Sequence, residues 1–249
     1  MKTMLKHFFS HPAIWLYMVI LAALLIYTGS FYGNVFTTYW WVMLIPIVLA
    51  PFFEWFAHKY ILHLKIGKFK EVDAAELGDV KPGDSVDYEK SRYKVLSIEN
   101  GRVKIGFGMA PKLPEFIRNG MYILHYGHHE NPNNIKLIFA PITFSVGLFA
   151  SMFATAYVIT FRLDIALLYT SAVVAYYIYY EWVHLGHHVS EYKPITNWSK
   201  NLKKAHLFHH YRNENLWWGI TNSLGDYALG TFKKHEEAPQ SESTMDINR

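Results

Sequence analysis

The sequence predicts an all-α integral membrane protein with four transmembrane helices in two hairpins, a cytoplasmic histidine-rich helical cap and a small β-rich insert. Three observations predict this fold class. Long stretches of the 249-residue chain contain no Asp, Glu, Lys or Arg; eleven of the fourteen histidines gather in four clusters; and residues 68–110 change to an alternating, turn-rich pattern. The composition agrees, because 51% apolar and 17% aromatic residues are unusual for a soluble enzyme.

The same pattern divides the chain into four parts. They are a first transmembrane hairpin with the first histidine cluster at residues 1–67, the β-rich cytoplasmic insert at residues 68–110, a second transmembrane hairpin with the remaining clusters at residues 111–235, and a flexible tail at residues 236–249.

The first hairpin is predicted from residues 8–53, which carry no charged side chain and are long enough for two membrane helices. We expect these helices over about residues 13–28 and 37–57. Pro46 and Pro51 should bend the second helix, because each removes a backbone hydrogen bond.

The second hairpin is predicted from two further uncharged stretches, residues 137–161 and 165–180, with a turn at residues 162–164 between them. We expect its first helix to end at about residue 160. A cleaved signal peptide over residues 14–26 is a weaker interpretation of the N-terminal apolar segment. No small-residue cleavage site precedes the second apolar stretch.

Charge predicts the orientation. Of the 24 Lys and Arg residues, only Arg162 falls on the far side of this topology, so both termini and the histidine clusters should be cytoplasmic. The membrane would be the inner membrane in a bacterium and the endoplasmic reticulum in a eukaryote. The net charge of +4 is therefore a topology signal, and no pattern of a nucleic-acid module is present. The absence of cysteine excludes disulfides and a thiolate-held cluster.

The insert at residues 68–110 is expected to be a small β-hairpin or SH3-like unit. Alternating runs at residues 93–98 and 103–107 flank an Asn100-Gly101 turn. The insert could be a docking surface for a redox partner or a lid over the site, but we favour a decoration without a role in catalysis.

The histidines repeat the pattern His-x-x-His-His three times. Residues i, i+3 and i+4 share one helix face, so each copy should turn its imidazoles toward one point. The looser pair His58 and His63 diverges on a regular helix, so either the helix end unwinds or the two serve different metals. The candidate metal ligands are His58, His63, His125, His128, His129, His184, His187, His188, His206, His209 and His210.

This number of imidazoles indicates two metal ions, because a structural zinc needs four ligands and usually includes cysteine. Each ion would be held by several neutral nitrogens with positions left for water or dioxygen, and zinc could occupy the purified protein. The nearby carboxylates Glu54, Glu130, Glu181 and Asp226 are candidate acceptors for imidazole N–H groups.

The chain resembles the fatty acid hydroxylase and sterol desaturase superfamily, and within it the fatty acid 2-hydroxylases. Four features carry the resemblance: the His58 and His63 pair, HYGHHENPNNIKLIFAP from position 125, YEWVHLGHH from position 180, and KKAHLFHHYRNENLWWGITNSLGDYALGT from position 203. The resemblance implies that ten of the candidate histidines are metal ligands. His187 is extra, since His184 and His188 already supply the usual third box.

Three departures affect what the resemblance implies. Asn133 and Lys136 stand where an Asp and an Arg are usual, and the insert at residues 68–110 lengthens the first gap. No fused cytochrome b5 domain is expected, so electrons should come from a separate donor such as a ferredoxin or cytochrome b5. Its docking site would be the basic rim formed by Lys200, Lys203 and Lys204.

The resemblance therefore implies a membrane di-iron monooxygenase that uses dioxygen to hydroxylate a long-chain fatty acyl lipid at C2. A sterol or carotenoid oxygenase or a desaturase would use the same histidines. From other classes, a membrane zinc hydrolase remains an alternative. A metal transporter is disfavoured, because the four uncharged spans hold no ionisable acidic or basic residue.

Overall fold

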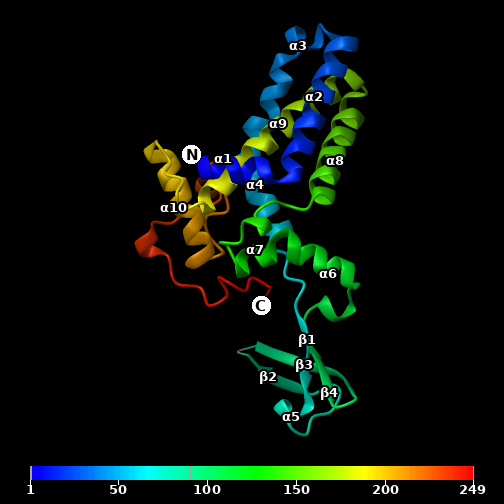
Figure 1. The fold of residues 1–249 in the computed structure, drawn as a ribbon, viewed down its shortest axis with the longest axis vertical. Helices are drawn as coiled ribbons and strands as arrows, with labels where there is room; N and C mark the ends of the chain where they lie inside the picture. The colour runs from blue at the N-terminus through cyan, green and yellow to red at the C-terminus, as the bar shows by residue number, and fades with distance from the viewer. Residues whose placement is uncertain (1, 90, 249) are drawn as a thin grey trace.

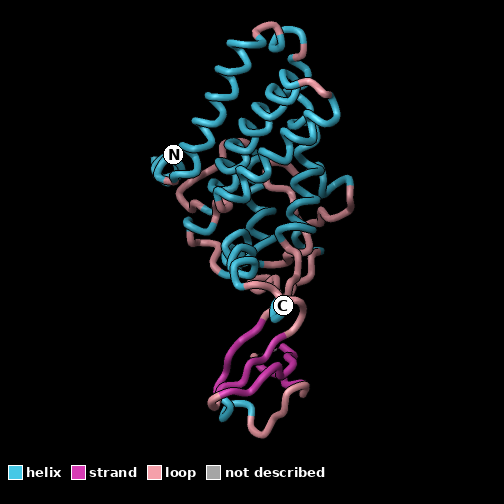
Figure 2. The backbone as a smooth tube through the Cα atoms, turned by 90° about the vertical axis from the view of Figure 1, so that its right-hand side faces the viewer, coloured by secondary structure: helices cyan, strands magenta, loops and turns pink. Residues whose placement is uncertain are grey.

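The computed structural model describes residues 2–89 and 91–248. Met1, Lys90 and Arg249, which belong to the predicted first, second and fourth parts, lie outside the described residues. The long helices form a bundle at one end of the molecule, and the small sheet stands at the opposite end (Figures 1 and 2). The helices that carry the histidines lie between them.

Within the described residues, four helical stretches are long and apolar enough to cross a membrane, which confirms the predicted number. They are Pro12–Tyr32, Trp40–Leu62, Ile135–Thr160 and Leu163–His188. Each is longer than predicted. The fourth differs most, because the helix continues through its histidines instead of ending at the aromatic run before them.

The helical elements occur in this order: α1 (Lys2–Ser10), α2 (Pro12–Tyr32), α3 (Val35–Thr38), η1 (Trp40–Met43), α4 (Leu44–Phe56), η2 (Ala57–Leu62), α5 (Ala74–Leu77), η3 (Ala110–Lys112), α6 (Glu115–Met121), η4 (Tyr122–Tyr126), α7 (Gly127–Glu130), η5 (Ile135–Leu137), α8 (Ile142–Thr160), α9 (Leu163–His188), α10 (Asn197–Tyr211), α11 (Leu224–Ala228) and η6 (His235–Glu237). Pro51 lies inside α4 as expected, whereas Pro46 falls in its first turn, where a missing N–H is tolerated.

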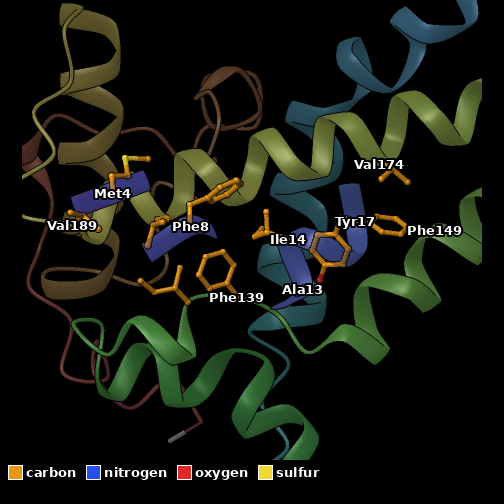
Figure 3. Packing of buried hydrophobic residues seen from close by; sticks show 11 residues of the cluster. Met4, Phe8, Ala13, Ile14, Tyr17, Phe139, Phe149, Val174 and Val189 are labelled. Carbon is orange, nitrogen blue, oxygen red and sulfur yellow. The ribbon is translucent and has the colours of Figure 1, made fainter. Parts of the chain in front are cut away.

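Helix α9 is the centre of the bundle, since α2, α4 and α8 all pack against it. The short helix α1 crosses its end and buries Met4 and Phe8 (Figure 3). The ring of Phe8 meets Trp182 of α9 edge-on with centroids 5.2 Å apart. Deeper in the bundle, Tyr17 of α2 hydrogen-bonds Ser145 of α8 at 2.5 Å. The bundle therefore holds the last turn of α9, with its histidines, at a fixed place.

The insert is a four-stranded antiparallel sheet in the order β1-β4-β3-β2. Its strands are β1 (Phe69–Asp73), β2 (Ser85–Tyr88), β3 (Ser91–Glu99) and β4 (Arg102–Gly106). The predicted hairpin is present as β3 and β4, and Asn100 and Gly101 in its turn both have positive φ. Val95, Val103 and Ile105 form its small core.

Two glycines form the neck between the sheet and the helical body. Gly67 and Gly108 have φ values of 86° and 67°. A Cβ on Gly67 would lie 2.1 Å from the carbonyl oxygen of Phe107, so only glycine lets the two connecting segments pass.

The segment predicted to be a flexible tail is instead packed against the helical body. Arg212 Nε donates to Ala238 O at 2.8 Å, and Ser241 N donates to Arg212 O at 2.8 Å. Further along, Ile247 is 1% exposed and packs with Ile66 and Tyr126. The polar composition suggested disorder, but its polar groups pair with the loop after α10.

Candidate metal centre

The structure gathers ten histidines into two groups, and within each group one ring nitrogen per residue lies within 4.8 Å of all the others. The first group is His58, His63, His125, His129 and His209, and the second group is His128, His184, His188, His206 and His210. Nine of the ten side chains are buried and His188 is partly buried. His187 belongs to neither group, because its Nε2 donates to the carbonyl of Ile220 at 2.9 Å.

Two of the three His-x-x-His-His copies divide between the groups, contrary to the expectation that each converges on one point. His206 and His210 join the second group, whereas His209 joins the first. On an α-helix, residue i+4 lies about 40° to one side of residue i and residue i+3 about 60° to the other. The i+4 residue His210 therefore faces the same group as His206, and the i+3 residue His209 faces the neighbouring group.

A π-helical turn explains the pair His58 and His63. The element η2 closes with a hydrogen bond from His63 N to His58 O at 3.0 Å, which is the i to i+5 pattern of a π-helix. This turn brings residues five apart onto one side, and both side chains enter the first group. A second π-helical turn, η4, leads into His125 and His129.

The donor set fits two metal ions. The Nε2 atoms of His58 and His125 are 3.1 Å apart, as are those of His63 and His129, and those of His188 and His206 are 2.8 Å apart. Two metal–nitrogen bonds of about 2.1 Å at right angles separate their nitrogens by about 3 Å. These contacts match ligands around a shared cation.

Hydrogen bonds fix which nitrogen faces the centre in the first group. The Nδ1 atoms of His58 and His209 donate to Trp218 O and Leu216 O, each at 2.7 Å, and Nδ1 of His129 donates to Thr244 O at 3.2 Å. A carbonyl only accepts, so each Nδ1 carries the hydrogen. The three Nε2 lone pairs are then free for a metal ion.

Burial keeps these rings neutral. It lowers the pKa of His129 to about 3, with a smaller contribution from neighbouring imidazoles. Burial also lowers the pKa of His206 and His209 well below the ordinary value. Neutral imidazole is the form that binds metal ions, so the protein has the ligands ready at neutral pH.

Two of the four predicted carboxylate acceptors bind backbone amides instead of imidazoles. Glu54 accepts hydrogen bonds from the amides of Ile220 and Thr221, at 3.1 and 2.9 Å, and from the hydroxyl of Tyr176 at 3.0 Å. Asp226 accepts from Trp218 N and Gly219 N, both at 2.8 Å. Both carboxylates therefore hold the loop whose carbonyls orient the histidines, and act on the rings only through it.

The other two carboxylates differ from each other. Glu130 lies 3.7 Å from Lys68 in a half-exposed ion pair. Glu181 is 1% exposed, one turn before His184, and lines the cavity described next. Among the described residues, backbone carbonyls rather than any of the four carboxylates accept the imidazole hydrogen bonds of the first group.

An apolar cavity of about 570 Å³ ends at the histidines. Its walls come from α4, α8 and α9, and its far end lies among Pro46, Met152 and Tyr169 inside the membrane-spanning stretches. His58 and His125 of the first group and His184 of the second line its other end. The cavity thus leads from the apolar bundle to the point where the two groups meet.

One of the three predicted docking lysines is engaged in the fold. Lys203 Nζ donates to the carbonyls of Gly186, Val189 and Tyr192 at 2.9, 2.7 and 3.0 Å, and so caps the end of α9. Burial lowers its pKa. Lys200 and Lys204 are exposed and border a surface hollow beside Phe208 and Tyr211.

Sequence reasoning missed the carbonyls of Leu216, Trp218 and Thr244, because a backbone oxygen leaves no residue signature. Gly219 is the one local signal. A Cβ there would lie 3.1 Å from Asp226 Oδ2 and 2.1 Å from Asn222 O, so glycine permits the loop to wrap around the carboxylate.

Comparison with known proteins agrees with this centre. Residues 115–231 match the fatty acid hydroxylase family. This segment is similar to fatty acid hydroxylase domains. This confirms the resemblance read from the histidine boxes, and the matched range includes every candidate histidine except His58 and His63.

Curated relatives of the domain are ceramide-modifying enzymes by name. The dihydroceramide fatty acyl 2-hydroxylase FAH1 of Arabidopsis thaliana is 32% identical over 122 residues, which are 49% of each protein. The ceramide very long chain fatty acid hydroxylase SCS7 of Saccharomyces cerevisiae is 32% identical over 115 residues, 45% of this chain and 28% of that protein. The chain spans about half the length of the first relatives it matches.

A solved structure shares the fold of the hydroxylase domain. The structure of full-length scs7p, in which only the hydroxylase domain is visible, superposes with a TM-score of 0.59 at 19% identity. The match covers 91% of this chain and 69% of that chain. At this identity the likeness establishes the fold alone.

Proposed function

We propose that the protein is a membrane di-iron monooxygenase that hydroxylates a long-chain fatty acyl lipid at C2, with dioxygen as oxidant and electrons from a separate donor. The observation that carries the proposal is the apolar cavity that joins the membrane-spanning helices to both histidine groups. An acyl chain is the substrate whose shape and polarity suit such a cavity.

The cavity residues would hold the chain and exclude water. Leu49, Phe53, Phe144 and Leu148 offer an apolar wall, so an acyl tail would lie along α4 and α8 with its carbonyl end near the histidines. Glu181 is buried at that end and supplies polar oxygens where the polar end of the substrate would arrive. This orientation presents the carbon next to the carbonyl, and the relatives named as 2-hydroxylases support that position.

The histidines would supply the metal ligands: five neutral nitrogens in each group, ten in all. When bound, a pair of iron ions supplies the redox chemistry that activates dioxygen toward a C–H bond. The protein contributes the alignment of the rings, through the loop held by Glu54 and Asp226, and the dry cavity beside them.

The site would face the cytoplasm, together with both ends of the described chain. Among the residues that the structure describes, Arg162 is the one basic residue at the opposite end of the long helices, where it pairs with Asp164 at 2.5 Å. Electrons would then arrive from a cytoplasmic protein such as a ferredoxin or cytochrome b5. The exposed Lys200 and Lys204 lie on α10, the helix that carries His206, His209 and His210, and so offer a docking surface close to both groups.

Lipid mass spectrometry tests the function. The chain is expressed in cells that lack 2-hydroxylated acyl lipids, beside a His128→Ala variant and a His235→Ala control outside both groups. The wild type and the control should accumulate 2-hydroxyacyl lipids labelled from ¹⁸O₂, and the His128→Ala variant should not. Hydrolysis products without ¹⁸O₂ incorporation would instead indicate a zinc hydrolase, and a new double bond would indicate a desaturase.

A further inference from the structure

The two histidine groups differ in how their rings are held. In the first group, three of the five rings donate Nδ1 to a backbone carbonyl. In the second group, the Nδ1 atoms of His128, His184, His206 and His210 are buried, and no acceptor for them occurs among the described residues. His188 is the exception in the second group, because the backbone of Pro132 accepts a hydrogen bond from its ring. Three rings are therefore anchored by the backbone in the first group and one in the second.

This difference has a direct consequence for metal affinity. A carbonyl that accepts from Nδ1 fixes the ring orientation and makes Nε2 a stronger ligand. A ring already held in place also loses less rotational freedom when it binds an ion. Loss of such a partner commonly lowers metal affinity by about 10- to 100-fold.

One of the three anchors comes from residues 241–248, which we call the strap. Thr244, whose carbonyl accepts from His129, is 4% exposed. Beyond it, Ile247 packs with Ile66 and Tyr126, and Asn248 bonds both backbone groups of Gly67, accepting from N at 2.9 Å and donating to O at 2.5 Å.

The strap is also fixed on its other side. Ser241 Oγ and Ser243 Oγ donate to Oε1 of the buried Glu214 at 3.0 and 2.6 Å. At the neck, Asp246 adds an ion pair with Lys68. Thr244 is thus held between two attachment points, one on the loop after α10 and one at the neck of the sheet. The position of its carbonyl depends on both.

We propose that the two groups hold their ions unequally: the first group retains its ion, the second group releases its ion first, and the strap contributes to this difference through His129. This inference rests on the proposed two-metal centre. It adds which of the two groups releases its ion first and which segment of the chain helps the other group to retain its ion.

The test measures release of Zn²⁺ from the zinc-loaded full chain in detergent, followed by the colour of an added chelator. The wild type should release one ion fast and one slowly, with rates that differ by about tenfold or more. His206→Ala should lose the fast phase and His209→Ala the slow phase, which assigns each phase to a group. Two ions leaving at one rate would overturn the inference and leave the two-metal centre intact, whereas fewer than two bound ions in the loaded wild type would overturn both.

Strap variants give the second arm of the test. Asn248→Ala and Ile247→Ala should speed the slow phase by about tenfold and leave the fast phase unchanged, while Met245→Ala, whose side chain is 40% exposed, should change neither. Two variants guard against misfolding, because each loosens the strap through a different contact, and an unchanged fast phase shows that the second group is still folded. A slow phase that is the same in both variants and the wild type would show that the strap has no part in holding the ion.

Discussion

At the scale of single residues, the buried carboxylates serve the loop after α10 more than the metal ligands directly. Glu54 reaches from α4 to the amides of Ile220 and Thr221, and Asp226 holds Trp218 and Gly219. Each bond ties down a short segment that has no regular structure of its own. The two carboxylates therefore orient the histidines indirectly, through the loop, without contacting an imidazole.

Glu54→Gln should destabilise the protein markedly. An amide NH₂ would then face one of the donors that Glu54 now accepts from, and a buried donor left unpaired costs about 1–3 kcal/mol. Glu130→Gln is the matched control, since that half-exposed ion pair contributes about 1 kcal/mol or less. Thermal unfolding in detergent compares them, and equal shifts in the two variants would contradict the structural role given to Glu54.

The buried histidines predict acid sensitivity of the metal-free protein. Burial lowers the pKa of His129 to about 3 and the pKa of His206 well below its ordinary value. Below about pH 6.5 these imidazoles therefore bind protons in the unfolded chain but remain neutral in the folded protein. Stability should be constant above pH 6.5 and fall below it, by about 1.4 kcal/mol per pH unit for each such histidine.

Unfolding of the chelator-treated protein from pH 8 to pH 5 measures this dependence. A metal-free protein whose stability rises as the pH falls would show that the rings are protonated in the folded state.

At the scale of elements, the sequence predicted the helices and the sheet better than it predicted how they end. The four spans and the β3–β4 hairpin follow from apolar length and from turn residues, which are local signals. The π-helical turn at His58 and the division of two of the boxes between the groups do not, because both depend on which partner helix faces the ring. The ordered strap was missed for the same reason: its partners are Gly67, Arg212 and Glu214, far away in the chain.

Helix α8 should set the length of acyl chain that the cavity accepts. Gly147 lines the cavity, and a Cβ there would meet no atom within 4 Å, so a larger side chain would extend into the space. Gly147→Leu should shift the preference toward shorter chains by about tenfold or more in kcat/KM, because displaced methylenes are worth about 1–3 kcal/mol. Ala150→Leu, exposed on the same helix and outside the cavity lining, should leave the preference unchanged in a chain-length competition assay.

Helix α10 should receive the electron donor. Reversing Lys200 and Lys204 to Glu should slow donor-dependent turnover severalfold at low salt, and the difference from wild type should shrink as salt screens the charges. Lys203 stays unchanged in this experiment because it caps α9. Lys81→Glu, an exposed position on the insert, is the control. Equal rates for the double variant and wild type at low salt would show that Lys200 and Lys204 do not bind the donor.

At the scale of the whole molecule, the long helices and the sheet lie at opposite ends (Figure 2), and α7 and α10, which carry five of the histidines, lie between them (Figure 1). The proposed topology puts the sheet and both ends of the described chain in the cytoplasm. Because the chain has no cysteine, single introduced cysteines report this directly. With an impermeant maleimide on intact cells, Asn34→Cys should be labelled and Ser85→Cys should be labelled only after permeabilisation. Labelling of Ser85→Cys in intact cells would contradict the proposed cytoplasmic location of the sheet.

The division of two histidine boxes between the groups also affects how bound ions would cross-link the chain. His209 shares a group with His58 and His63, which precede the sheet insert in the sequence. Its neighbours His206 and His210 share the other group with His184 of α9. Loaded with ions, the centre would therefore work as two interlocked cross-links that close long loops, in a chain that cannot form a disulfide. A shift of α7 or α10 along its axis would strain both links at once, because each of these helices carries ligands of both groups. The ions would thus tie α7 and α10 to α9 through one group and to His58 and His63 through the other.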